Sequence, residues 1–160
     1  MTQSAVIVTG VASGIGYACA HDLLTDGVPV VAADIGEIPA ALVNAGDCLP
    51  LSFDVSSEQS CQEAVATATA RFGGVRALIH FAGIHHTKTW DEFTGEDFAH
   101  VYAVNVTGFF LIARCGRANA GLRWIYRAHR VGRCVAWRRR RRWSGRSSRR
   151  RRQATHRPTR

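Results

Sequence analysis

Apolar and polar positions alternate in blocks along the first two thirds of the chain. Short continuous apolar runs, typical of strands that are covered on both faces, occupy residues 5–8, 28–33, 48–53 and 77–81. Longer segments with helical spacing lie at residues 14–25 and 58–72, where Ser56 or Ser57 can cap the helix, and from about Thr94 through Asn105 to Arg114. This order of elements predicts an α/β fold with a doubly wound parallel sheet.

The charge of the chain divides it into two parts. Residues 1–113 hold all twelve acids and only three basic residues, a net charge of −9, whereas residues 114–160 hold eighteen arginines and no acid; together they give the formal net charge of +9. No periodic apolar pattern remains beyond Val135. We expect a folded domain over residues 1–116 and a disordered, Arg-rich tail over residues 117–160. The sheet would then be incomplete, with its fourth strand left as an exposed edge.

The most specific motif is a glycine-rich loop between the first strand and the first helix. It reads Thr9-Gly10-Val11-Ala12-Ser13-Gly14-Ile15-Gly16. Gly10 allows a tight turn, Gly14 lets the backbone approach a pyrophosphate, and Gly16 permits close packing of the helix. The N–H groups of the helix N-terminus, around Ser13 and Ile15, face the phosphates. An ordinary glycine-rich turn is the alternative for the motif taken alone, but its context favours a dinucleotide site.

Asp34 follows the second strand, close to the ~20 residues after the glycines at which an acid meets the adenosine ribose. A carboxylate there repels a 2′-phosphate, and no Lys or Arg lies near Ser13 or Ile35 to neutralise one. The sequence therefore predicts NAD as the cofactor in preference to NADP.

These residues resemble the short-chain dehydrogenase/reductase family, which shares the T-G-x-x-x-G-x-G spacing and a Rossmann-type fold. The resemblance covers residues 4 to about 116. It implies adenine contacts from Asp54 and Val55, a cofactor contact from Ala82 and Gly83 as the end of the family's N-A-G motif, and a proton-relay role for Asn105. Phe81, preceded by His80, stands where the family usually has Asn, which implies a lost side-chain contact.

The family's chemistry also needs a Ser, a Tyr and a Lys four residues after that Tyr, so that an electrostatically tuned phenol can exchange the proton. The sole lysine is Lys88, and no Tyr precedes a Lys at this spacing. Tyr126 and Arg130 have the spacing, but Arg replaces Lys poorly in geometry. His85 and His86 follow the N-A-G position, where the family often has substrate contacts. A polar loop without such contacts explains both residues equally well. We expect this chain to be inactive in hydride transfer.

The composition of the tail suggests a displaced reading frame, because Arg codons are abundant in GC-rich DNA. If the first base is discarded, the codons of residues 123–133 permit Gly-Gly-Ser-Ile-Val-His-Ile-Ala-Ser-Val-Gly, which resembles the family's fifth strand and catalytic Ser. No residue after Val135 can supply a Tyr codon in that frame. The catalytic Tyr would then lie beyond residue 160 or need a second frame disturbance.

Two other functions remain open. Arginine runs interleaved with Trp124, Trp137 and Trp143 could bind nucleic acid, although charge alone indicates only non-specific affinity. The chain could also be a non-catalytic NAD-binding module.

The remaining expectations concern partners and location. The resemblance implies a small-molecule alcohol or ketone as substrate, and a homo-oligomer formed through the helix that ends near Arg114 and the next helix. The five cysteines lack paired spacing, so no metal site is expected. The N-terminus has no signal-peptide pattern and no apolar run approaches the length of a membrane span, which predicts a cytoplasmic protein without membrane contact.

Overall fold

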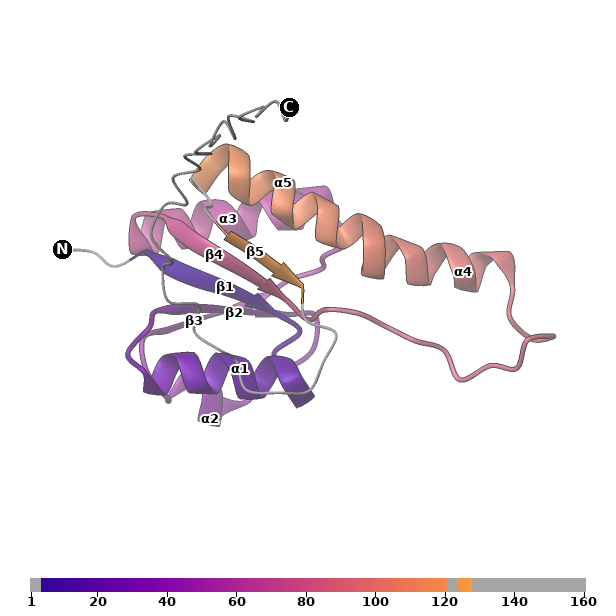
Figure 1. Cartoon of the computed structure of the whole chain (residues 1–160), viewed down its shortest axis with the longest axis horizontal. Helices are drawn as coiled ribbons and strands as arrows, with labels where there is room; N and C mark the ends of the chain where they lie inside the picture. Colours follow the sequence, from indigo (N-terminus) through magenta and orange to yellow (C-terminus); the bar gives the residue numbers. More distant parts are fainter. Residues whose placement is uncertain (1–3, 121–123, 128–160) are drawn as a thin grey trace, which may run out of the picture.

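The computed structural model describes residues 4–120 and 124–127 and contains one parallel sheet (Figure 1). The strand order is β3-β2-β1-β4-β5, and each neighbouring pair is parallel. The five strands are β1 (Ala5–Thr9), β2 (Val30–Asp34), β3 (Cys48–Ser52), β4 (Val75–His80) and β5 (Trp124–Arg127). The predicted doubly wound, Rossmann-type architecture is confirmed.

Helices cover both faces of the sheet (Figure 1). They are α1 (Gly14–Thr25), α2 (Ala40–Val43), α3 (Glu58–Phe72), α4 (Gly95–Tyr102), the π-helical segment η1 (Ala103–Gly108) and α5 (Phe109–Ala120). Alternate residues of β1 point to opposite faces. Val6 and Val8 pack in a cluster with residues of α1 and α2, whereas Ala5 and Ile7 pack in a cluster with residues of α3 and α5.

Local sequence signals place the helix ends accurately. The predicted helices at residues 14–25 and 58–72 are confirmed at both ends. Ser57 is the N-cap of α3 and accepts a hydrogen bond from the Ser60 N–H, while Gly73 ends the helix with φ of 72°. The predicted strands differ from the observed ones by one or two residues. The third predicted helix continues from Arg114 to Ala120 and has a π-helical segment in its middle.

The expected exposed edge at the fourth strand is wrong, because β5 pairs with β4. Ile79 lies opposite Tyr126 and His80 opposite Arg127. The run Trp124-Ile-Tyr combines aromatic and β-branched residues, which favour extended backbone, and it lies beside the open edge of β4. Residues 128–160, on which the prediction of a disordered tail mostly falls, lie outside the described residues.

One helix contradicts the expectation that no segment is long and apolar enough to span a membrane. Residues 95–118 form 24 continuous helical residues, and an 18-residue stretch within them has a mean hydropathy of 1.3. A helix that packs on a sheet in a soluble protein can be equally long and apolar. Leu111, Ile112 and Cys115 are buried in the core together with residues of α3, as expected for a helix that covers a sheet.

The helix pair α3 and α5 packs closely around buried thiols. Cys61 of α3 is fully buried and donates a hydrogen bond to the Val55 carbonyl oxygen, with an Sγ–O distance of 3.4 Å. Burial raises the pKa of the Cys61 thiol to about 12, with a smaller contribution from Cys115. Both thiols are free, and they act as small apolar residues in this interface.

We predict that Gly108→Ala destabilises the fold. A Cβ at Gly108 would lie 2.8 Å from Cγ1 of Val55 and 3.1 Å from its carbonyl oxygen, so the helix or the strand-to-helix loop would have to move. The expected loss is about 1–3 kcal/mol in the free energy of unfolding, measured by urea denaturation. Gly95→Ala is the control, because nothing lies within 4 Å of its Cβ position. Equal stability of both variants would contradict this packing.

Candidate functional site

The predicted cofactor residues gather at one edge of the sheet. Because all strands are parallel, their carboxyl ends share an edge, and this is where ligands bind in open α/β sheets. Backbone hydrogen bonds join the loops after β1 and β4 to the ends of the neighbouring strands. Gly10 donates to Ala33 with an N–O distance of 2.9 Å, and Phe81 donates to Thr9 at 3.1 Å.

The three glycines of the loop have different structural roles. Gly10 has φ of 76°, and a Cβ there would lie 2.6 Å from the Ala82 backbone nitrogen. Gly16 packs against the same turn, since its Cβ would lie 1.9 Å from the Gly10 carbonyl oxygen. Gly14 has φ of 58° and nothing within 4 Å of its Cβ position. The loop therefore closes on itself at Gly10 and Gly16 and leaves open space beside Gly14, where a phosphate group can approach the backbone.

The start of α1 is suited to an anion. Ser13 is the N-cap with extended backbone, and its side chain makes no capping hydrogen bond. Ile15 is 41% exposed in the first turn. The first N–H groups of a helix have no partner within the helix and carry partial positive charge, so they attract phosphate oxygens.

Asp34 connects the end of β2 to the glycine loop. Its Oδ2 accepts a hydrogen bond from the Ala12 N–H and its Oδ1 accepts one from the Gly36 N–H, both with N–O distances of 2.8 Å. The sequence places Asp34 near the loop but gives no sign of the bond to Ala12. Each carboxylate oxygen has a second lone pair, so the side chain can still accept hydrogen bonds from ribose hydroxyls.

The Asp54–Val55 pair lies in the loop between β3 and α3. The Asp54 carboxylate accepts hydrogen bonds from the Ser56 N–H at 2.8 Å and from its hydroxyl at 2.7 Å. Val55 as a whole is only 4% exposed and belongs to the core. It therefore offers little surface for the adenine contact that the resemblance implies, and that contact stays a prediction.

A buried pair of side chains joins β1 to β4 beneath this edge. Thr9 and His80 lie opposite each other in the sheet, are 0% and 1% exposed, and have their Oγ1 and Nδ1 atoms 2.8 Å apart. The Thr9 hydroxyl also accepts a hydrogen bond from the Ala82 N–H at 3.3 Å. Phe81 follows this pair directly, and the loss of a side-chain contact there stays a prediction. Sequence reasoning missed the Thr9–His80 bond because it depends on strand register.

Asn105 fixes the turn that follows Gly83. Its Oδ1 accepts a hydrogen bond from the Ile84 N–H and its Nδ2 donates to the Ile84 carbonyl oxygen, both at 2.8 Å. The residue lies in η1, and π-helical segments often occur at functional sites. Its position beside Ala82 and Gly83 agrees with a place in the site, while its role in proton relay stays a prediction.

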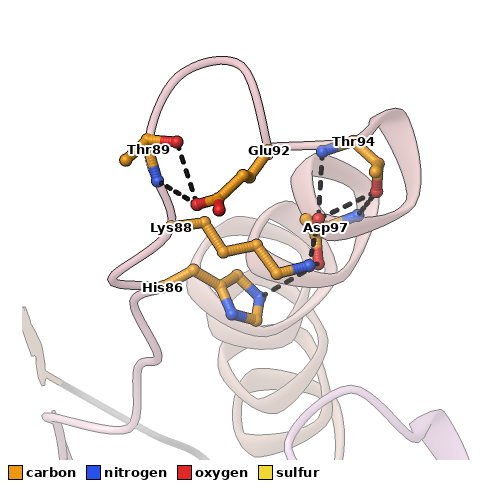
Figure 2. Close-up of polar contacts among 6 residues, drawn as sticks. All are labelled: His86, Lys88, Thr89, Glu92, Thr94 and Asp97. Atoms are coloured by element: carbon orange, nitrogen blue, oxygen red, sulfur yellow. Dashed lines mark hydrogen bonds and ion pairs between the residues drawn. The ribbon is translucent and has the colours of Figure 1, made fainter.

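The polar residues of the next loop form a separate cluster at the start of α4 (Figure 2). Lys88 donates to both carboxylate oxygens of Asp97 at 2.7 Å, and Thr94 and Asp97 form a capping box. The Lys88 hydrogen bonds, followed by those from Thr94, hold the pKa of the Asp97 carboxyl well below its usual range. His86 lies beside them, with its Nε2 atom 4.0 Å from Oδ1 of Asp97. This cluster anchors the loop to α4, and its lysine is already paired with an acid.

The described residues contain no catalytic tyrosine–lysine pair and no group of three metal-ligating side chains. Tyr17 packs against the cluster beneath α1. Tyr102 is 51% exposed and stacks on Phe98. Tyr126 lies in β5 opposite Ile79, and Arg130 lies outside the described residues.

The parallel sheet and the glycine loop agree with the expected short-chain dehydrogenase type of fold. Residues 4–119 match the short chain dehydrogenase family, and the chain belongs to this family. It is 37% identical over 111 residues to 2,5-dichloro-2,5-cyclohexadiene-1,4-diol dehydrogenase LinX of Sphingobium indicum, covering 66% of this chain and 44% of that protein. It is 35% identical over 125 residues to human 3-hydroxyacyl-CoA dehydrogenase type-2, covering 72% of this chain and 48% of the relative. The chain thus spans less than half the length of these relatives.

Solved structures agree with this assignment. The F189W actinorhodin polyketide ketoreductase with NADPH superposes with a TM-score of 0.69 at 27% identity, over 74% of this chain and 48% of that one. A short-chain dehydrogenase/reductase from Brucella melitensis superposes with a TM-score of 0.67 at 26% identity, over 76% and 55% of the two chains. Family members bind a nicotinamide cofactor and act on small molecules.

We predict that Gly16→Ala disrupts the loop and Gly14→Ala does not. At Gly16 a methyl group would meet the Gly10 carbonyl oxygen at 1.9 Å, so the expected loss is at least about 2 kcal/mol in the free energy of unfolding. At Gly14 only the positive φ is unfavourable, which costs about 1 kcal/mol. Thermal unfolding of the two variants distinguishes these costs, and an equal loss at both positions would contradict the loop geometry.

Proposed function

We propose that this chain is the cofactor-binding part of an NAD-dependent oxidoreductase of the short-chain dehydrogenase/reductase type. The complete reaction transfers a hydride from NADH to a ketone, which takes up one proton to become an alcohol, or runs in reverse. The observation that supports the cofactor most directly is the position of the Asp34 carboxylate, hydrogen-bonded to Ala12 within the glycine loop. The pyrophosphate and the adenosine ribose are adjacent in NAD, and this bond keeps their two candidate binding elements adjacent.

The charge around Asp34 favours NAD over NADP. The carboxylate would lie beside the 2′ position of the ribose, where a phosphate would bring two like charges together. Glu37 adds a second acid three residues later, and residues 10–38 contain no Lys or Arg. One similar solved structure contains NADPH, so the fold alone does not select NAD, and the proposed preference depends on these side chains.

The rest of the proposed cofactor site follows the same edge. Gly10, Ser13, Gly14, Ile15 and Gly16 would bind the pyrophosphate through backbone N–H groups. Asp54 and Val55 would lie beside the adenine, and Ala82 and Gly83 would contact the cofactor across the β1–β4 junction. Asn105 would act near the reacting atoms, since it holds Ile84 next to Gly83.

We propose further that this chain does not catalyse hydride transfer. No tyrosine in the sequence is followed by a lysine four residues later, so the proposed site lacks the family's tuned phenol that would supply the proton for the carbonyl oxygen. The displaced-frame hypothesis explains the loss, because the tail takes the place of the segment that carries these residues in the family. A non-catalytic NAD-binding module is the second candidate, supported by the same loop and Asp34.

The intact enzyme would form a homo-oligomer through the helix α4–η1–α5. Its exposed face carries Phe98, Tyr102 and Phe110, which are 61%, 51% and 58% exposed. Exposed apolar faces of this kind mark protein interfaces. The alcohol or ketone substrate and a cytoplasmic location remain part of the proposal.

We predict that Asp34→Asn weakens NAD binding. The variant loses the negative charge that accepts the ribose hydrogen bonds, so the dissociation constant should rise by about tenfold, or ~1.4 kcal/mol. Isothermal titration with NAD and NADP measures both cofactors, and the preference for NAD should fall in the variant. Asp22→Asn, which removes an exposed acid of α1, is the control for charge alone. Tighter binding of NADP than NAD by the unaltered chain would contradict the proposed specificity.

We predict no NADH oxidation by this chain with a broad panel of aldehydes and ketones. The DNA that encodes residues 115–160 should be resequenced and translated in all three frames, and a chain with the restored frame assayed in parallel. Turnover by the restored chain alone is the expected result. Turnover by the chain as printed would show that another residue supplies the proton. If every other frame closes quickly, the displaced-frame hypothesis is wrong.

A further inference from the structure

His80 ends β4 inside the sheet, shortly before the turn that carries Ala82 and Gly83. It is 1% exposed and lies opposite Thr9 of β1, and its Nδ1 atom is 2.8 Å from the Thr9 Oγ1 atom. Thr9 is itself 0% exposed, and its hydroxyl accepts a hydrogen bond from the Ala82 N–H at 3.3 Å. The three groups therefore form a buried chain that leads from the imidazole of β4, through the hydroxyl of β1, to the turn.

The Thr9 hydroxyl has one proton, and the place of this proton decides the direction of the chain. If Nδ1 of His80 carried a proton, the hydroxyl would receive two N–H groups, and its own proton would be buried without an acceptor among the described residues. A buried donor without a partner costs free energy, whereas hydrogen bonds that run in one direction polarise and strengthen one another. This favours a hydroxyl that donates to Nδ1 and an imidazole with its proton on Nε2.

The position of Ala82 matters to the glycine loop because the two lie in direct contact. A Cβ at Gly10 would lie 2.6 Å from the Ala82 backbone nitrogen, so a shift of the turn changes the space beside the loop. Asn105 holds the other end of the same turn through the Ile84 N–H and carbonyl groups. The turn thus has two side-chain anchors, the Thr9 hydroxyl at Ala82 and the Asn105 amide at Ile84.

We propose that His80 is a positioning residue for the cofactor. As the acceptor of the Thr9 proton, it fixes the hydroxyl in the orientation that receives the Ala82 N–H. The turn is then held against the glycine loop, where Ala82 and Gly83 contact the cofactor. This role rests on the proposed cofactor function and extends it to a buried side chain that does not itself touch the cofactor.

A purely structural role for His80 is the alternative, because its imidazole also packs against an aromatic ring. Its centroid lies 5.3 Å from that of Phe109 at the start of α5, with an angle of 49° between the two planes. Two substitutions separate the roles. His80→Phe keeps an aromatic ring beside Phe109 and removes the acceptor. His80→Asn removes the ring and keeps an acceptor, because its Oδ1 is bonded to Cγ as Nδ1 is in histidine.

The first experiment compares the two variants with the unaltered full chain by isothermal titration with NAD. His80→Phe should weaken NAD binding by about fivefold, the effect of one lost hydrogen bond, whereas His80→Asn should stay within about twofold of the unaltered chain. A structural role predicts the reverse order, because asparagine leaves space beside Phe109. The proposal is overturned if His80→Asn binds NAD as weakly as His80→Phe or more weakly, or if all three proteins bind it equally.

The second experiment begins with a measurement that needs neither a variant nor NAD. The nitrogen resonances of the His80 ring, recorded at about pH 8, where histidine side chains are ordinarily neutral, should show an unprotonated Nδ1 and a protonated Nε2. Amide hydrogen exchange at Ala82 should then be several-fold faster in His80→Phe than in His80→Asn, which should match the unaltered chain. A proton on Nδ1, or equal exchange at Ala82 in both variants, would overturn the proposal.

The two experiments separate the positioning role from the cofactor function itself. If the unaltered chain does not bind NAD, the cofactor function fails and the effect on affinity fails with it. The hydrogen-bond chain from His80 to Ala82 is still decided by the protonated nitrogen and by the exchange rates. If NAD binds but Nδ1 carries the proton, the cofactor function stands and the positioning role of His80 is wrong.

Discussion

The close approach of backbone segments at the end of β1 is the constraint on which the rest of the site depends. A side chain at Gly16 would collide with the carbonyl oxygen of Gly10, and a side chain at Gly10 would collide with the Ala82 backbone. Because neither position has a Cβ, the first turn of α1 and the turn after β4 both lie against the same loop. This proximity lets the Thr9 hydroxyl bond Ala82 and places Ala12 within reach of Asp34.

Backbone groups therefore form most of the candidate site, and a few side chains hold its loops in place. Asp34 holds the loop after β2, the Thr9–His80 pair joins β1 to β4, and Asn105 holds the turn that begins at Gly83. Each of these side chains bonds to another loop or strand of the same edge. The arrangement is suited to a dinucleotide, whose pyrophosphate needs N–H donors and whose ribose needs a carboxylate. Among the described residues no tyrosine is followed by a lysine four positions later, and the loss of hydride transfer remains our proposal.

The sequence predicts those parts of the fold that depend on local chemistry. The capping serines at 56 and 57 indicated the start of α3, and the glycine loop located the start of α1. The short helix α2 was missed because a single turn has no periodicity to detect. The strand β5 was missed because its apolar residues are embedded among arginines, and only the open edge of β4 reveals a partner for them. The Thr9–His80 and Asp34–Ala12 contacts join residues 71 and 22 positions apart, and only the strand order brings such pairs together.

The most direct test of the cofactor assignment is a titration of the chain with NAD followed through its backbone amide chemical shifts. We predict that shifts concentrate at residues 10–16, 34–36, 54–55 and 82–84, all at one edge of the sheet. We also predict little change in the cluster of Lys88 and Asp97 at the start of α4. An absence of shifts at saturating NAD, or shifts confined to the arginine-rich residues, would contradict the assignment of this edge as a cofactor site.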